Sequence, residues 1–200
     1  MRCLMCGKEK GTGSLKDILF GKDPLCEECR SQWVKINYSF MLEGVPVFCP
    51  YLYEEHFSAA LIQYKECGDE ALKDVFLYEY RRYLRMHYPG YTLCLLPSSE
   101  KKREERGFSH LCGMFESAGM PMMEPFVKLS DVSQKKQNRL ERQEMTHGIA
   151  LKEGIVLPER ILLCDDTVTT GSTMKGALNV LPERKVKIFA LSCSRFHLPS

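Results

Sequence analysis

The pattern of apolar and polar residues predicts an alternation of strands and helices along most of the chain. Residues 91–96 and 161–164 are largely apolar runs, as expected of strands that are buried on both faces. Residues 185–192 have an apolar centre and predict a last strand. Apolar side chains recur every three or four positions over residues 54–65 and 69–87, which predicts two helices that each bury one face. This order indicates the α/β class, with a doubly wound and mostly parallel sheet.

Other segments have weaker patterns. Residues 32–45 show no clean period, so we expect a linker there. Residues 45–51 are interrupted by prolines, and we therefore expect an edge strand at most. Four more short elements are predicted: helices at 108–118 and 174–181, and strands at 125–129 and 149–157.

Length and composition limit the domain organisation. The chain has 200 residues, of which 44% are hydrophobic, enough for one α/β domain with a small appendage. We expect a small module over residues 1–40 and the α/β domain over residues 45–200. The net charge of +2 is too small to indicate nucleic-acid binding by itself. There is no apolar run long enough for a membrane-spanning helix, so none is expected.

Four of the ten cysteines form two C-x2-C pairs. Nineteen residues separate Cys3/Cys6 from Cys26/Cys29, a spacing typical of zinc sites. Because thiolates would fill all four positions, a zinc ion here is expected to be structural. The alternatives are a redox pair or a disulfide framework. The first pair begins at Cys3 and leaves no room for a signal peptide before it, so we expect a cytoplasmic protein whose other cysteines are buried thiols.

The run at 161–164 leads into the most informative segment. Two acids, Asp165 and Asp166, follow it. The next residues form a turn rich in hydroxyl groups, namely Thr167, Thr169, Thr170, Gly171, Ser172 and Thr173. A turn that opens a helix points free backbone N–H groups and the positive end of the helix dipole at one place, which suits a phosphate. Carboxylates at the end of a strand suit sugar hydroxyls or a divalent cation. The pattern predicts a sugar-phosphate site, and the alternative is an ordinary helix capped by Asp or Thr.

Residues 161–173 resemble the ribose-phosphate-binding motif of the type I phosphoribosyltransferases, enzymes that bind 5-phosphoribosyl-1-pyrophosphate (PRPP). The whole chain resembles the ComF family, competence-associated proteins that join a zinc-binding N-terminus to such a domain. Two further segments carry the resemblance: Lys65 with Gly68-Asp69, and Arg106-Gly107-Phe108. The chain departs from the family at Ser109 and His110, where ComF proteins have Asn-Gln.

The resemblance implies a type I phosphoribosyltransferase-like fold and a role for each residue. Asp165 and Asp166 would hold the ribose diol at the catalytic centre, and the turn from Thr167 to Thr173 would bind the 5-phosphate. Mg²⁺ would be bound with PRPP. The expected pyrophosphate contacts are Lys101, Lys102 and Arg106. A solvated loop of mixed charge is the alternative for this basic stretch.

A polar segment occupies residues 130–144 and has almost no apolar periodicity, so we expect a mobile loop or a polar helix. The resemblance implies a lid that folds over the active site and excludes water. The family pattern is matched by Gln137, Leu140 and Arg142. It is not matched by Met145 and Gly148, which stand where Arg and Asn are usual, and this weakens the prediction of lid closure and of chemistry.

Three functions follow. The first is PRPP binding in natural competence, with single-stranded DNA and a competence helicase as partners in DNA uptake. The second is an active transferase that moves ribose 5-phosphate to a nitrogen acceptor, which the sequence does not identify, and releases pyrophosphate. The third is a structural zinc adaptor with a vestigial pocket.

For DNA, the candidate residues are Arg81, Arg82 and Arg85, which lie among tyrosines, as on surfaces that bind single strands. The simpler interpretation of that helix is a core stripe with a solvated basic face.

Overall fold

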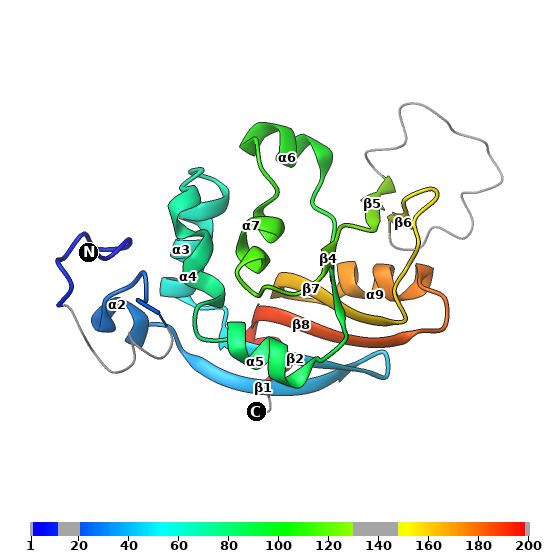
Figure 1. The fold of residues 1–200 in the computed structure, drawn as a ribbon, viewed down its shortest axis with the longest axis horizontal. Helices are drawn as coiled ribbons and strands as arrows, with labels where there is room; N and C mark the ends of the chain where they lie inside the picture. Colours follow the sequence, from blue (N-terminus) through cyan, green and yellow to red (C-terminus); the bar gives the residue numbers. More distant parts are fainter. Residues whose placement is uncertain (1, 12–20, 130–147, 199–200) are drawn as a thin grey trace.

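The computed structural model describes residues 2–11, 21–129 and 148–198. One six-stranded sheet has the order β1-β2-β8-β7-β3-β4. In this sheet β1 and β2 are antiparallel, and all other neighbouring strands are parallel. Its strands are β1 (Lys35–Leu42), β2 (Val45–Leu52), β3 (Thr92–Leu95), β4 (Met122–Met123), β7 (Arg160–Val168) and β8 (Lys185–Cys193). The predicted α/β class with a mostly parallel sheet is confirmed (Figure 1).

Helices connect the parallel strands. The connections from β2 to β3 and from β3 to β4 advance in one direction across the sheet, and the connection from β7 to β8 runs the other way. Because such crossovers are right-handed, the helices of the first two connections and α9 lie on opposite faces, which is the doubly wound arrangement. The helices are α2 (Glu27–Ser31), α3 (Glu55–Lys65), η1 (Glu70–Leu72), α4 (Lys73–Leu77), α5 (Arg81–His87), α6 (Glu100–Arg106), α7 (His110–Glu116), α9 (Ser172–Val180) and η3 (Arg195–His197).

The central strands form the core between these two layers. The apolar run from Ile161 to Cys164 is fully buried, as are Leu93 and Cys94 of β3. Figure 1 shows α3, α4 and α7 on one side of the sheet. A separate antiparallel pair is formed by β5 (Phe126–Lys128) and β6 (Ile149–Leu151), so both short strands predicted in this part of the chain are present.

Two predictions near the N-terminus are wrong. Residues 32–45, expected to be a linker, contain β1, and β2 is an internal strand between β1 and β8 rather than an edge strand. Pro50 is absent from both registers of β2, and Pro46 precedes its first pair with β8. The missing proline N–H groups therefore cost the sheet few hydrogen bonds. The sheet begins at Lys35, inside the range 1–40 that we expected for the small module.

The helix predicted over residues 69–87 is divided into η1, α4 and α5. Glu79 lies at the break before α5 and accepts hydrogen bonds from Lys35 Nζ at 2.6 Å and from the Tyr51 hydroxyl at 2.8 Å. The apolar stripe continues across the break, because Phe76 and Tyr80 are both buried. The period of the pattern was therefore correct, and the continuity of the helix was not.

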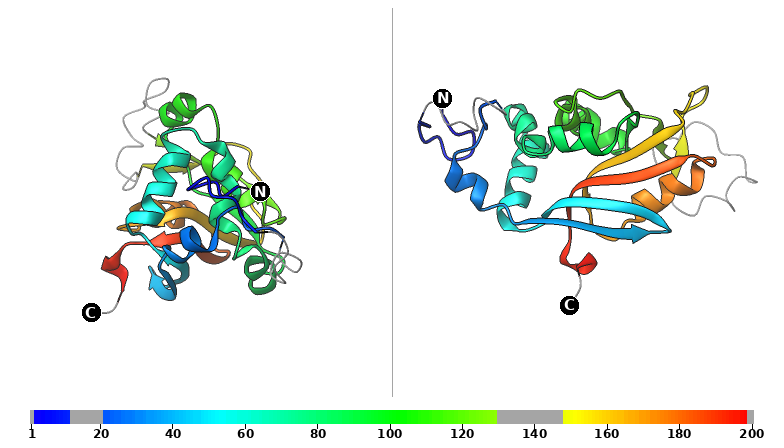
Figure 2. Two further views of the ribbon diagram at one scale, coloured as in Figure 1. Left: turned by 90° about the vertical axis from the view of Figure 1, so that its left-hand side faces the viewer. Right: turned by 60° about the horizontal axis from the view of Figure 1, so that its bottom comes forward.

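The two ends of the described chain lie on different sides of the sheet. The N-terminal residues and α2 lie at one end of it, beside α3, and η3 projects from the side away from α3 and α4 (Figure 2). Within residues 2–11, 21–129 and 148–198, none of the helices has the length and apolar character that crossing a bilayer requires.

Candidate functional site

The four cysteines of the C-x2-C pairs converge at the N-terminus. The Sγ atoms of Cys3, Cys6, Cys26 and Cys29 all lie within 4.8 Å of one another, and those of Cys6 and Cys26 are 3.7 Å apart. Four sulfur ligands at the usual Zn–S distance stand about 3.8 Å apart in a tetrahedron. All four cysteines are free thiols. The cluster therefore fits a zinc ion held by four thiolates, as the spacing predicted.

Backbone hydrogen bonds build this cluster. The Gly7 N–H donates to the Cys3 carbonyl at 2.9 Å, and Gly7 has a φ of 71°, a conformation that favours glycine. The Leu4 N–H donates to the Pro24 carbonyl at 3.1 Å and ties the two pairs together. Burial alone would raise the pKa of Cys3, but nearby backbone N–H groups, that of Cys26 first, outweigh it and lower this pKa to about 6. One ligand is therefore prepared to bind metal as a thiolate near neutral pH.

The acid pair lies inside a strand rather than after it. We expected the strand to end at Cys164, but β7 continues to Val168, because β8 pairs with it as far as Cys193. Asp165 and Asp166 are consequently successive residues of one strand, and successive side chains of a strand point to opposite faces of the sheet. The two carboxylates have different surroundings for this reason.

Asp166 belongs to a buried network on the side of α3 and α7. Its Oδ2 accepts hydrogen bonds from Lys65 Nζ at 2.7 Å and from His110 Nε2 at 2.8 Å, and its side chain is only 10% exposed. Burial alone would raise the pKa of Asp166, but the hydrogen bond from His110 and the charge of Lys65 outweigh it and hold this pKa well below its usual range. Burial lowers the pKa of His110. Asp166 is therefore an ionised carboxylate committed to partners from its own chain.

His110 is the residue of this network that the sequence did not identify. It is the first residue of α7, within the helix predicted at 108–118. The contact with Asp166 joins residues 56 positions apart, so no local pattern signals it. Lys65, by contrast, belongs to one of the segments that carry the family resemblance.

The pKa of Asp165 is shifted in the opposite direction to that of Asp166. Burial and the adjacent charge of Asp166 raise its pKa to about 8. Its Oδ1 accepts the Asp166 N–H at 2.9 Å, and its exposure exceeds that of the buried Asp166. Lys128 of β5 acts in the other direction and lowers this pKa, which puts a cation of the β5–β6 pair within range of Asp165.

The turn after β7 exposes most of its hydroxyl groups. Thr169, Thr170 and Ser172 are exposed, and Thr173 is half-buried in the first turn of α9. Gly171 precedes the helix with a φ of 74°, a conformation that favours glycine. A Cβ there would stand 3.0 Å from Leu42 Cδ1, so the Leu42 side chain would have to shift to admit one. The turn thus opens a nine-residue helix towards solvent, a geometry that suits an anion.

Thr167 lies before this turn and has a different role. Its Oγ1 is 2.9 Å from Ser192 Oγ, and the Ser192 hydroxyl donates to the Asp166 carbonyl at 3.1 Å. The Thr167 side chain therefore cross-links β7 to β8 beside the acid pair, so its predicted place in a phosphate site stays a prediction.

The three basic residues expected to contact pyrophosphate have different orientations on α6. The Arg106 side chain is 7% exposed and its guanidinium donates to Glu66 Oε1 at 2.7 Å. Its Nε is buried and has no hydrogen-bond partner among the described residues. Lys101 is 84% exposed and lies 3.9 Å from Glu105, one helical turn along; Lys102 is also exposed. The pyrophosphate role of this group stays a prediction.

Other predicted features fall outside the site as described. The proposed lid at residues 130–144, with Gln137, Leu140 and Arg142, lies outside the described residues, as does Met145 after it. A hollow of about 1090 Å³ adjoins the cysteine cluster, with Arg30 and Trp33 in its wall, and one of about 190 Å³ adjoins Tyr88. Neither hollow includes a residue of β7 or α9, so the candidate site is an open turn rather than part of either.

The chain is similar to two curated proteins. It is 26% identical to the competence protein ComFC of Streptococcus pneumoniae (strain ATCC BAA-255 / R6) over 219 aligned positions, which cover 96% of this chain and 99% of the relative. It is 24% identical to the competence protein ComFC of Bacillus subtilis (strain 168) over 184 positions, which cover 91% of this chain and 72% of the relative. No protein-family model matches the chain. These similarities support a ComFC-like competence protein, as the motifs predicted.

Proposed function

We propose that the chain binds PRPP, or another ribose 5-phosphate ligand, and acts in natural competence on the cytoplasmic side of the membrane. The names of both relatives support the competence role. The observation that carries the ligand is the accessible hydroxyl turn at the N-terminus of α9, directly after the two acids of β7. Backbone N–H groups, hydroxyl donors and the helix dipole all favour a phosphate dianion there.

Asp165 is the carboxylate that we propose for the ribose diol. Asp166 Oδ2 already accepts hydrogen bonds from Lys65 and His110, whereas Asp165 is more exposed and points to the other face. Mg²⁺ bound with PRPP would neutralise part of its pyrophosphate charge. The residues proposed to contact that pyrophosphate are Lys101, Lys102 and Arg106.

Thermal unfolding in the presence of ligand tests this proposal. A ligand that binds only the folded state stabilises it by about 2.7 kcal/mol at one hundred times its dissociation constant. We expect ribose 5-phosphate and Mg²⁺-PRPP to stabilise the wild-type protein, and Asp165→Asn to reduce both effects. An undiminished effect in this variant would move the sugar site elsewhere, and no effect on the wild type would remove the proposal.

Single-stranded DNA is the macromolecular partner we propose, with the surface of α5 as its contact and a competence helicase as a further partner. Arg82 and Arg85 of α5 are exposed, and the half-buried Tyr83 lies between them in sequence. Exposed cations suit the phosphates of a single strand.

The salt dependence of binding to a single-stranded oligonucleotide tests the DNA proposal. We expect affinity to fall steeply with salt, and Arg82→Ala and Arg85→Ala each to reduce the slope by about 1. Lys152→Ala is the control, because Lys152 follows β6, which lies well away from α5 (Figure 1). Binding that does not depend on salt, or an equal effect of Lys152→Ala, would exclude α5 as the contact.

An active phosphoribosyltransferase is the second candidate. It is favoured by Arg106, whose buried Nε has no partner among the described residues and which lies close enough to His110 to affect its pKa. A buried, unused donor of this kind is suited to a leaving pyrophosphate. Release of pyrophosphate from PRPP, screened across nucleobases and ammonia, tests the activity; no release with any acceptor would leave ligand binding alone.

A further inference from the structure

The C-terminal residues hold the turn at which we propose phosphate to bind. The Thr169 carbonyl accepts hydrogen bonds from His197 Nε2 at 2.7 Å and from the Ser194 hydroxyl at 3.3 Å. One residue earlier, the Val168 carbonyl accepts the Ser194 N–H at 2.9 Å. The segment around η3 therefore donates three hydrogen bonds to two successive carbonyls, those of Val168 and Thr169, which lead into the turn.

Aromatic rings fix the orientation of His197. Its imidazole stacks on the ring of Phe40, with centroids 4.6 Å apart and planes at 15°. Phe40 in turn stacks on Tyr38 at 6.0 Å and 21°, and both belong to β1. Phe196 packs edge-on against the imidazole at 5.5 Å. A donor held in this way loses little side-chain freedom when it forms its hydrogen bond.

The β1–β2 hairpin restrains the helical side of the same turn. Leu42 lies so close to Gly171 that an added Cβ would meet it at 3.0 Å. Glu43, at the tip of the hairpin, is 2.7 Å from Lys175 in α9. These contacts restrain the start of the helix but not the peptide between Thr169 and Thr170. That peptide is the part of the turn whose carbonyl accepts the hydrogen bond from His197.

We infer that His197 is a positioning residue for the phosphate turn, acting through the Thr169–Thr170 peptide. A trans peptide is planar, and its C=O and N–H groups point in opposite directions. By holding the Thr169 carbonyl towards η3, His197 keeps the Thr170 N–H directed away from η3, as a donor ready for an anion. It also keeps a carbonyl dipole from turning towards the bound phosphate. The inference rests on the proposed function, because it concerns the same turn.

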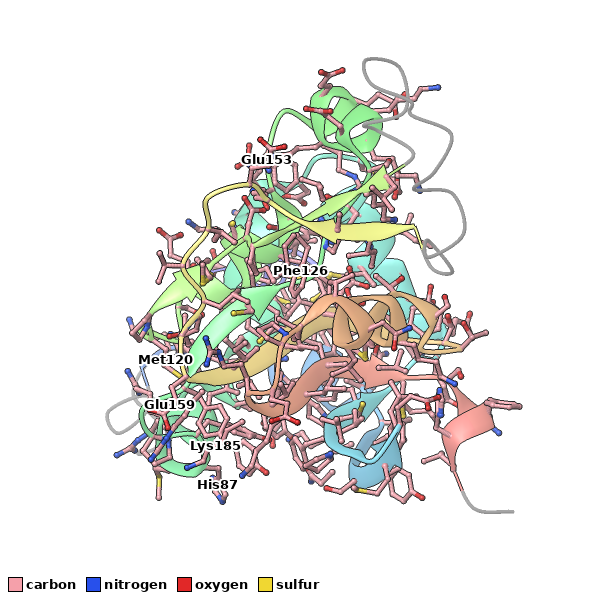
Figure 3. The ribbon with its side chains drawn as sticks, turned by 90° about the vertical axis from the view of Figure 1, so that its right-hand side faces the viewer. His87, Met120, Phe126, Glu153, Glu159 and Lys185 are labelled. Carbon is pink, nitrogen blue, oxygen red and sulfur yellow. The ribbon has the colours of Figure 1, made fainter. Side chains whose placement is uncertain are left out.

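Ribose 5-phosphate binding by His197 variants tests the inference. His197→Ala should weaken the affinity by about 2- to 10-fold, the equivalent of one hydrogen bond, and His197→Gln, which keeps an N–H donor, should recover most of the loss. His87→Ala is the matched control: His87 Nδ1 is 3.0 Å from the Tyr83 carbonyl and its ring stacks on Tyr83 at 3.9 Å. His87 is the last residue of α5, and Figure 3 labels it well away from α9, the helix that the turn opens. This control should leave the affinity unchanged.

Amide hydrogen exchange without ligand separates this inference from the proposed function. Exchange of the Thr170 amide should be faster in His197→Ala than in the wild type, and it should be unchanged in His87→Ala. The comparison is made under conditions in which the three proteins have the same free energy of unfolding. If the wild type binds ribose 5-phosphate and His197→Ala binds it equally well, the inference fails and the proposed function stands. If the wild type binds none, the proposed function fails, and an unaltered Thr170 exchange rate would then overturn the positioning role as well.

Discussion

Asp165 and Asp166 are neighbours in sequence, and the fold makes them opposite in acidity. Asp166 is held ionised by Lys65 and His110, whereas burial beside Asp166 raises the pKa of Asp165 to about 8. The sequence predicted the pair as a candidate site, but it could not predict this difference. Lys65 and His110 lie 101 and 56 positions away from Asp166, and the alternation of a strand, not a local motif, separates the two carboxylates.

The raised pKa of Asp165 predicts a pH dependence of ligand affinity. An ionised carboxylate accepts hydrogen bonds from a diol better than an acid does, so affinity for ribose 5-phosphate should rise as the pH passes about 8. The phosphate itself ionises a second time near pH 6, which gives a separate rise at lower pH. Calorimetric titrations between pH 5 and 9 measure both. Asp165→Asn should keep the lower rise and lose the upper one; an upper rise that survives in this variant would assign it to another group.

Asp166→Asn should destabilise the fold. It leaves the half-buried Lys65 and the buried His110 without their carboxylate, and breaking such a network costs about 3 kcal/mol. Urea unfolding at pH 7 gives the free energy of unfolding. Asp165→Asn is the matched control, with the same chemical change one residue away, and should cost far less. Equal losses in the two variants would contradict the different roles of the acids.

The pH dependence of stability has opposite signs for the two acids. The pKa of Asp166 is lowered by folding, so its contribution is present above the unfolded value near 4 and is lost as the pH falls below it. The pKa of Asp165 is raised to about 8, so its contribution is greatest below pH 4 and is lost as the pH rises to 8. We therefore expect Asp165→Asn to gain stability relative to the wild type between pH 4 and 8. A difference that does not change with pH over this range would contradict the raised pKa.

At the scale of the elements, the sequence predicted helices and strands best where the apolar residues follow a single clear pattern. The buried runs of β3, β7 and β8 and the apolar face of α3 were identified from their patterns. β1 was missed, although Ile36, Tyr38, Phe40 and Leu42 alternate with exposed residues, a clear period of two. The break before α5 had no local signal, and Glu79 at the break contacts Lys35 and Tyr51, which are distant from it in sequence.

The zinc module offers a test at this scale. Cys6→Ser should lower the zinc content of the purified protein from one ion per chain towards none, because a structural site needs its four ligands. Cys67→Ser is the control, since Cys67 is also an exposed free thiol but lies outside the cluster. Metal analysis of both variants decides the matter; full zinc in Cys6→Ser would exclude the four-cysteine site.

At the scale of the whole molecule, β1 connects the cysteine cluster to the turn that precedes α9. It follows α2 of the cysteine cluster, carries Tyr38 and Phe40 beneath His197, and ends with Leu42 against Gly171. Trp33, just before β1, is 3% exposed and packs against Tyr51 at 5.3 Å. This packing anchors the start of β1 in the core of the main domain, independently of the metal.

Loss of zinc should therefore leave the ligand site intact. With Trp33 buried, β1 keeps its place when the cysteine cluster loses its ion. We expect the affinity of Cys6→Ser for ribose 5-phosphate to stay within about twofold of the wild type, a change of under 0.5 kcal/mol. Titration calorimetry on both proteins measures it. A loss of tenfold or more would show that the module and the turn are coupled through β1.

The central claim is that the turn from Thr169 to Thr173 binds the phosphate of a ribose 5-phosphate ligand. Amide hydrogen exchange of the wild-type protein, with ribose 5-phosphate and with ribose as the control, locates the bound phosphate most directly. We predict slower exchange at residues 169–173 with ribose 5-phosphate and no change there with ribose. Protection confined to another part of the chain, or equal protection by ribose, would contradict the account.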